Sequence, residues 1–158
     1  MYLGTFGREV DGKGRIIVPA KLKETLEESG GGRRSELILT VGFERCLSLF
    51  PKRQWADFVK REIDSRSSLS RDTRALKRIL AGNAQSVEID RQGRLLIPKT
   101  FLDGHLQLSP RARRVVVVGT MDHIEIWRED SWSAFSKDMR QDFDEIAEKI
   151  SRSGGAVA

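Results

Sequence analysis

The sequence has little of the chemistry that cross-links a chain or holds a metal ion. Its 158 residues include one cysteine, Cys46, and two histidines. A single cysteine cannot form a disulfide within the chain, and a four-cysteine zinc site is excluded. The usual setting of such a chain is the reducing cytoplasm, which we therefore expect as its location.

Long apolar runs are also missing. The longest aliphatic run, residues 115–118, is far shorter than the roughly 20 residues that cross a bilayer. The first ten residues contain Arg8 and Glu9 and no long apolar stretch, so they do not form a secretory signal. We therefore expect neither a membrane-spanning segment nor a membrane partner.

Charge is plentiful but unevenly placed. The chain has 28 lysines and arginines against 23 aspartates and glutamates, a net charge of +5. Basic residues dominate residues 52–78, whereas acidic residues dominate residues 129–148. This asymmetry predicts a polyanionic partner such as nucleic acid on one surface and a solvated acidic element elsewhere.

The strongest organising feature is an internal repeat. Residues 9–19 align with residues 88–98, and the aligned pairs include Asp11 with Asp90 and Gly14 with Gly93. Residues 38–58 align with residues 115–135 in the same order. The shift between the two alignments falls where the first copy has the loop Gly30 to Gly32, to which we assign no role. The chain is therefore predicted to be a tandem duplication.

Each copy predicts the same order of elements, which makes the fold class α+β. A strand leads into a turn, then an aliphatic strand that ends at a proline, a short helix, two strands and an amphipathic helix. The strands are expected at residues 2–10, 15–18, 37–41 and 46–50, and again at 84–89, 94–97, 115–118 and 124–127. The closing helix of the second copy is expected to carry one apolar stripe from Trp132 to Ile150.

Between the copies, Ser70 is predicted to cap a helix that runs to about residue 81. Its basic side chains share one face and its apolar side chains another: Arg71, Arg74 and Arg78 against Leu76, Ile79 and Leu80. The basic face fits a nucleic-acid contact, and it equally fits an ordinary solvated surface.

The duplicated Asp-x-x-Gly motif is typical of a type I turn, in which the aspartate accepts backbone hydrogen bonds and the glycine tolerates positive φ. An arginine follows each glycine, Arg15 in the first copy and Arg94 in the second. Each arginine can pair with its aspartate or project toward a partner, and spacing alone leaves both open. Lys13 and Arg91 add a further cation to each turn.

These motifs together resemble the MraZ family. The resemblance is carried by the duplicated Asp-x-x-x-Arg, the aliphatic triplet followed by proline, the opening residues 1–4 and the middle segment 78–84. It covers nearly the whole chain up to the acidic terminal helix. It implies a tandem-duplicated AbrB-like swapped-hairpin β barrel with peripheral helices. The parts would be a first AbrB-like repeat at 1–64, a connecting basic helix at 65–82, a second repeat at 83–135, and an acidic helix and tail at 136–158.

The resemblance also implies a function. Members are bacterial transcriptional regulators that assemble into ring-shaped homo-oligomers and bind double-stranded DNA at short direct repeats in the promoter of the division and cell-wall gene cluster. We therefore expect a nucleoid-associated protein that contacts DNA through Lys13, Arg15, Arg91 and Arg94. The turns that present these side chains would be held in shape by Asp11, Gly14, Asp90 and Gly93. The second turn has Arg91 and Gln92 where the first has Gly12 and Lys13, so the two repeats need not contact DNA equally.

We expect no catalytic residues, metal ligands, cofactor or small-molecule substrate. Cys46 and His123 occupy equivalent positions in the two copies, but two ligands do not make a closed zinc site. We interpret both as packing residues, and we expect His105 at the end of a helix. Residues 11–15 resemble a phosphate loop but lack its spacing.

Two other function classes fit the same composition. One is a protein-interaction module of the antitoxin type, which would copurify with a stoichiometric partner. The other is a non-specific nucleic-acid-binding assembly protein, which would bind RNA and DNA equally.

Overall fold

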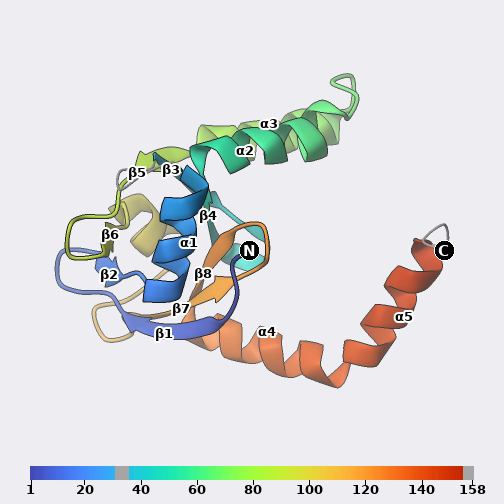
Figure 1. The fold of residues 1–158 in the computed structure, drawn as a ribbon. Helices are drawn as coiled ribbons and strands as arrows, with labels where there is room; N and C mark the ends of the chain where they lie inside the picture. The colour runs from blue at the N-terminus through green and yellow to red at the C-terminus, as the bar shows by residue number, and fades with distance from the viewer. Residues whose placement is uncertain (31–35, 155–158) are drawn as a thin grey trace. The chain divides into compact units, whose positions relative to one another are not determined.

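The computed structural model describes residues 1–30 and 36–154, and these fold as a mixed α+β protein (Figure 1). The α+β class predicted from the order of elements is therefore confirmed. The strands are β1 (Thr5–Glu9), β2 (Arg15–Ile17), β3 (Leu37–Val41), β4 (Leu47–Pro51), β5 (Gln85–Val87), β6 (Arg94–Leu96), β7 (Arg114–Gly119) and β8 (Ile124–Arg128). The α-helices are α1 (Ala20–Gly30), α2 (Lys52–Val59), α3 (Arg71–Gly82), α4 (Glu129–Gln141) and α5 (Phe143–Ser153).

Three short helical turns complete the described elements. They are a 3-10 turn η1 (Phe43–Arg45) and two π-helical turns, η2 (Lys60–Asp64) and η3 (Thr100–His105). Residues 1–128 form one compact unit, and residues 129–158 form a second.

Both sheets contain strands from both repeats. A six-stranded sheet has the order β1-β7-β8-β4-β3-β5, and a two-stranded sheet joins β2 to β6. β5 is the equivalent of β1, β7 of β3 and β8 of β4, so the order reads the same from either end when equivalents are exchanged. The first strand of each repeat thus pairs with the other repeat, β1 with β7 and β5 with β3. The duplication predicted from the sequence is built as one interleaved, pseudo-symmetric unit.

Strand alternation decides which side chains enter the core. On β2 and β6 the middle residues, Ile16 and Leu95, are buried, while Ile17 and Leu96 are exposed. The helix that follows the first proline buries Leu22 and Leu26 against the same core. Its counterpart after the second proline is the shorter turn η3. The hydrophobic core is therefore shared by both repeats rather than divided between them.

The helical hairpin of α2, η2 and α3 lies beside the sheet at the top of Figure 1. The predicted cap is confirmed: the Ser70 hydroxyl accepts a hydrogen bond of 3.4 Å from the Thr73 backbone N–H. Leu80 is buried, as its place on the apolar face predicts, but Ile79 is 53% exposed. The apolar face of α3 is therefore narrower than predicted, because only one side of the helix packs on the protein.

Most predicted strands differ from the observed ones by a residue or two at an end, and the first strand and the terminal helix differ more. The first strand begins at Thr5 rather than at residue 2, because Gly4 adopts φ +102° and interrupts it. The prediction of a single terminal helix is wrong. Asp142 leaves helical geometry, with φ −99° and ψ 7°, and separates α4 from α5. Asp144 and Glu145 in the first turn of α5 favour a new helix start there. Of the loop Gly30 to Gly32, Gly31 and Gly32 lie outside the described residues, as does the tail 155–158.

Neighbouring leucines on β6 test this core assignment. We expect Leu95→Ala to lower the free energy of unfolding by about 2–5 kcal/mol, because it empties space in a packed core. Leu96→Ala should change it by no more than about 0.5 kcal/mol, because that side chain faces outward. Urea unfolding at one fixed protein concentration measures both values. Equal losses in the two variants would contradict the outward placement of Leu96.

Candidate nucleic-acid interface

The first turn is organised by the carboxylate of Asp11. Its Oδ1 accepts hydrogen bonds of 2.9 Å from the backbone N–H groups of Lys13 and Arg15. Its Oδ2 accepts a 2.8 Å bond from Nε of the Arg15 side chain. The Gly14 N–H also donates to the Asp11 carbonyl over 3.0 Å. One aspartate therefore fixes both the turn and the arginine that follows it.

The second turn repeats this arrangement. Asp90 Oδ1 accepts 2.9 Å bonds from the backbone N–H groups of Gln92 and Arg94, and Oδ2 accepts a 2.8 Å bond from Arg94 Nε. The Gly93 N–H donates to the Asp90 carbonyl over 3.0 Å. The two turns have matching bonds although the residues between the aspartate and the glycine differ.

Backbone hydrogen bonds tie the two turns to each other. The Gly14 carbonyl accepts a bond of 2.9 Å from the Ile97 N–H, and the Gly93 carbonyl accepts one of 2.9 Å from the Val18 N–H. Each turn is thus held by the strand end of the other repeat, and both lie at the same end of the protein, at the left of Figure 1. The two arginines consequently belong to one rigid surface.

Positive φ angles make glycine necessary at the fourth position of both turns. Gly14 has φ +83° and Gly93 has φ +77°. A Cβ on Gly14 would also lie 3.1 Å from Leu102 Cδ1, whereas a Cβ on Gly93 would meet only the Lys23 side chain, at 3.8 Å. The first turn therefore tolerates a side chain less well than the second.

The sequence spacing leaves open whether each arginine pairs with its aspartate or projects toward a partner, and the structure shows which occurs. Both arginines pair with their aspartates, and they do so through Nε. The Arg15 and Arg94 side chains are still 23% and 30% exposed. Among the described residues, no hydrogen bond is recorded to the Nη atoms of either arginine. Pairing through Nε fixes the plane of each guanidinium and leaves the Nη edge for a partner.

Hydrogen bonds lower the pKa of both aspartates. The backbone N–H of Arg15 is the main cause that lowers the pKa of Asp11 to about 2, assisted by its side chain. The backbone N–H of Arg94 likewise lowers the pKa of Asp90. Both carboxylates are therefore ionised at neutral pH, as their ion pairs with the arginines require.

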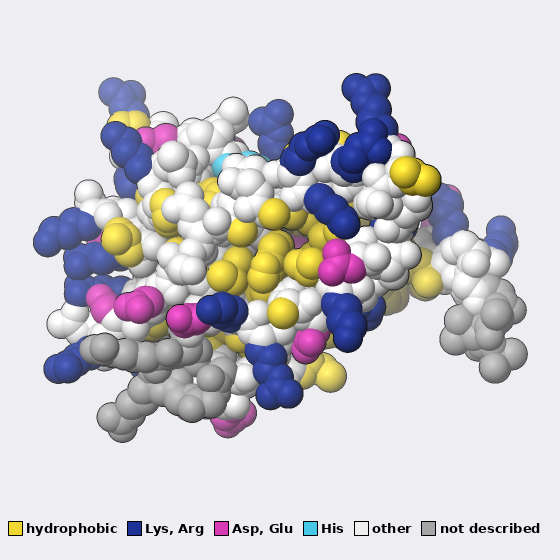
Figure 2. Space-filling model, turned by 90° about the horizontal axis from the view of Figure 1, so that it is seen from above, with side chains coloured by type: hydrophobic (Ala, Val, Ile, Leu, Met, Phe, Trp, Pro, Cys, Tyr) yellow, Lys and Arg dark blue, Asp and Glu magenta, His cyan; other side chains and the backbone are white. Residues whose placement is uncertain are grey.

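Further cations lie near the turns. Lys13 and Arg91 are exposed. Arg8 Nε donates a bond of 3.0 Å to the Ile17 carbonyl, and Arg113 Nη2 donates one of 3.4 Å to the Asp11 carbonyl. Figure 2 shows lysine and arginine side chains gathered at the left end of the protein, the end at which the turns lie. The sequence reasoning missed Arg8 and Arg113, because contacts through backbone carbonyls have no motif.

Two exposed aliphatic side chains on the same sheet were also missed. Ile17 is 59% exposed and Leu96 is 55% exposed. Both residues belong to aliphatic triplets. The hydrophobicity of a triplet predicts a strand but does not say which of its side chains face the core and which face solvent. The available signal was the two-residue alternation with Arg15 and Arg94, which places Ile17 and Leu96 on the arginine face.

The histidines and the cysteine form no reactive site in the described part of the chain. Burial raises the pKa of the Cys46 thiol, the opposite of what a nucleophile needs. His123 stacks on Phe50 with ring centroids 4.6 Å apart, and the Glu125 and Asp122 carboxylates outweigh its burial and raise its pKa. His105 Nε2 lies 2.8 Å from the Cys46 carbonyl, at the end of η3. Within the described residues no group of three potential metal ligands gathers.

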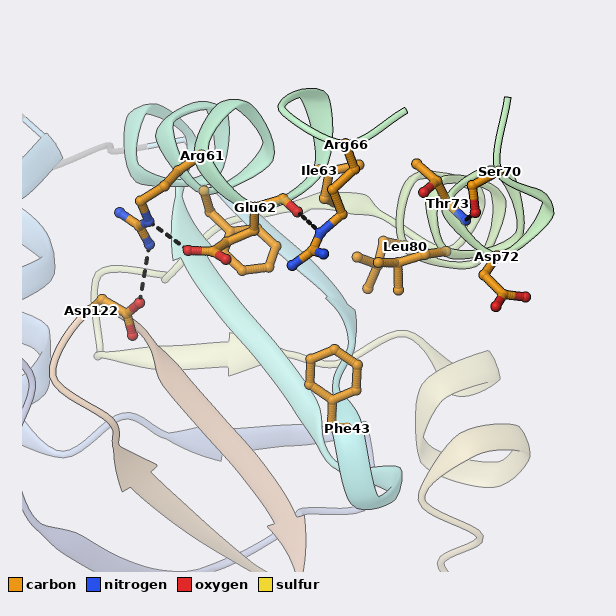
Figure 3. A pocket seen from close by; sticks show the side chains of 12 residues that line it. Phe43, Arg61, Glu62, Ile63, Arg66, Ser70, Asp72, Thr73, Leu80 and Asp122 are labelled. Carbon is orange, nitrogen blue, oxygen red and sulfur yellow. Dashed lines mark hydrogen bonds and ion pairs between the residues drawn. The ribbon is translucent and has the colours of Figure 1, made fainter. Parts of the chain in front are cut away.

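A pocket of about 600 Å³ opens between the α2–η2–α3 hairpin and the neighbouring strand loops (Figure 3). Three of its charged side chains pair with one another: Arg61 Nε lies 2.7 Å from Glu62 Oε1, and Arg61 Nη2 lies 3.7 Å from Asp122 Oδ2. Apolar side chains, among them Phe43, Ile63 and Leu80, line the rest. The residues lining this pocket include no paired nucleophile and base.

None of the described helices is long and apolar enough to cross a bilayer.

The fold and the site together define a tandem-duplicated α+β protein with one arginine-bearing turn per repeat. The chain belongs to the MraZ family. A family model described as "MraZ protein, putative antitoxin-like" matches residues 1–79 and again residues 80–152. The two matched segments agree with the duplication seen in the strand order.

Individual relatives match over nearly their whole length. A protein of Ligilactobacillus salivarius is 35% identical over 150 residues, which cover 95% of this chain and 96% of the relative. One of Limosilactobacillus reuteri is 36% identical, covering 95% and 97%, and one of Clostridium tetani is 32% identical, covering 98% and 99%. Each of these relatives carries the name "Transcriptional regulator MraZ", a name that describes no catalytic activity.

The acidity of Asp11 provides a test of the turn. We expect its carboxyl to titrate near pH 2 in the folded protein and to rise only part of the way to 3.8 in Arg15→Ala, because the backbone N–H groups of residues 13 and 15 still donate. A carboxyl whose pKa is lower in the folded than in the unfolded protein stabilises the fold at pH values above its unfolded pKa. This contribution to stability is lost as the pH falls toward 2. NMR titration of the Asp11 carboxyl carbon measures it. A complete return to 3.8 in Arg15→Ala would show that the side chain, not the backbone, controls the turn.

Proposed function

We propose that the protein is a sequence-specific DNA-binding transcriptional regulator that contacts DNA with its paired turns. The observation that carries the proposal is the reciprocal bonding of the two turns, which presents Arg15 and Arg94 from one rigid surface. The names of the relatives support the regulatory role. The turns take the place of the recognition helix that many regulators use.

The chemistry of the turns suits a phosphate backbone and base edges. The Nη edge of an arginine can bind a phosphate, or it can form a bidentate contact with guanine O6 and N7 in the major groove. Lys13 and Arg91 have exposed side chains that suit phosphate contact. Phosphate contacts would supply most of the affinity, and base contacts the choice of sequence. Because the two turns carry different cations, their contributions to binding are expected to differ.

Oligomer formation completes the proposal. A single subunit offers few DNA contacts, and linked subunits can raise apparent affinity by roughly 10² to 10⁴ when their spacing matches that of the sites. We therefore propose a ring-shaped homo-oligomer that engages direct repeats in the promoter of the division and cell-wall gene cluster, as family membership implies. Such a protein acts in the cytoplasm, in association with the nucleoid.

The same proposal includes the finer architecture. The exchange of β1 and β5 between repeats supports a swapped-hairpin arrangement of two AbrB-like repeats, at residues 1–64 and 83–135. Residues 65–82 connect them, and residues 136–158 form the acidic end. The closed barrel stays a proposal, since the described strands are assigned to one open sheet and one two-stranded sheet.

A protein-interaction role of the antitoxin type is the second candidate. The family description and the exposed side chains of Phe143 and Ile150 on the acidic helix α5 favour it. Copurification of a stoichiometric protein partner, with no preference for native DNA, would support this alternative.

Fluorescence anisotropy with a duplex from upstream of the protein's own gene tests the main proposal. We expect wild-type protein to prefer this duplex over a scrambled one. Arg15→Ala and Arg94→Ala should each weaken binding, because each removes a positioned guanidinium. Binding should also fall with salt, at about 0.9 in logarithmic slope per phosphate contact, and the slope should be smaller in a variant that has lost an arginine bound to phosphate.

Arg140→Ala is the matched control, since it removes the same charge from an exposed position on α4, outside the turns. It should bind as wild type does. Equal binding to native and scrambled duplexes, or native binding that survives both turn substitutions, would contradict the proposal.

A further inference from the structure

The outward face of the β2–β6 sheet carries two cations and two aliphatic side chains in a symmetric pattern. Arg15 lies opposite Leu96 in the antiparallel register, and Ile17 lies opposite Arg94. Residues two apart on a strand, and residues directly opposite across an antiparallel pair, point to the same side. These four side chains therefore share one face, while Ile16 and Leu95 fill the core behind it.

Folding does not account for the two outward aliphatic side chains. Ile17 and Leu96 are more than half exposed, so their burial contributes little to the core. Strand propensity favours a β-branched residue such as Ile17 but gives no reason for leucine at the equivalent position. The pair recurs at equivalent positions of the two repeats, each member next to the arginine of the other repeat. A partner that meets both arginines also meets both aliphatic side chains.

We propose that Ile17 and Leu96 determine sequence specificity by contacting the C5 methyl groups of thymines in the major groove. The inference rests on the proposed function and extends it to two residues. A two-stranded β-ribbon fits the major groove, where the thymine methyl is the apolar group that marks a base pair. The arginines on the same face provide hydrogen-bond donors for guanine or for phosphate.

The dimensions agree with this arrangement. Opposite residues on an antiparallel pair have Cβ atoms about 4.5–5.5 Å apart, whereas base pairs are stacked at about 3.4 Å. An arginine and its opposite aliphatic side chain therefore reach base pairs no more than about two steps apart. Leu96 also lies beside the first turn, since its Cδ1 is 3.9 Å from the Cβ position of Gly14. Each half of the ribbon would read a thymine close to the contact made by an arginine.

Replacing thymidine by deoxyuridine throughout the upstream duplex tests this inference, because it removes the methyl groups and keeps every hydrogen-bonding group. Wild-type protein should lose about fourfold in affinity for each methyl that it contacts. The double variant Ile17→Ala, Leu96→Ala should bind the thymine and uracil duplexes equally. Leu69→Ala, Ile79→Ala is the matched control, since it removes two exposed aliphatic side chains elsewhere, and it should keep the wild-type loss.

Several outcomes would overturn the inference. Equal wild-type affinity for the two duplexes would do so, as would an undiminished uracil penalty in the Ile17, Leu96 variant. A change in the subunit mass of that variant, measured by light scattering, would assign the side chains to a protein interface instead. In each case, native binding that still depends on Arg15 and Arg94 would leave the proposed function standing. Failure to prefer the native duplex over a scrambled one would overturn both.

Discussion

The two hydrogen bonds that cross between the turns are the constraint on which the rest of the site depends. The Gly14 carbonyl accepts from the Ile97 N–H, and the Gly93 carbonyl accepts from the Val18 N–H, so each turn is attached to the strand end of the other repeat. A turn that carries an exposed arginine would otherwise be free to move with its loop. Here the position of Arg15 relative to Arg94 is set by main-chain bonds and by a shared core.

Aspartate adds a second level of control. Asp11 and Asp90 hold their turns through backbone N–H groups and use the remaining oxygen to orient an arginine. This arrangement resolves the apparent conflict between an ion pair and a binding role. The pair engages Nε, so the guanidinium plane is fixed before a ligand arrives and less side-chain freedom is lost on binding. A lysine could not do this, because it lacks a separate edge for the partner.

Much of this arrangement could be predicted from local sequence. The spacing of Asp11 and Gly14 indicates a turn, and its repetition at Asp90 and Gly93 indicates a duplication, because turn chemistry is local. The Ser70 cap was predictable for the same reason. The bonds from Ile97 to Gly14 and from Val18 to Gly93 were not, because main-chain pairing between distant segments does not depend on side-chain identity. The outward position of Leu96 could have been predicted from its two-residue alternation with Arg94, whereas the apolar stripe from Trp132 to Ile150 continues through the break at Asp142 and does not mark it.

Hydroxyl-radical footprinting with the upstream duplex tests most directly whether the paired turns form the DNA-binding surface. Four exposed aliphatic side chains can report where DNA covers the protein. Ile17 and Leu96 lie on the outward face of the β2–β6 sheet, whereas Ile79 lies on the basic helix α3 and Leu69 just before it. The account predicts that DNA protects Ile17 and Leu96 from oxidation, relative to the free protein, and leaves Leu69 and Ile79 unchanged. Protection of Leu69 and Ile79 with no change at Ile17 and Leu96 would contradict it and assign the DNA contact to α3.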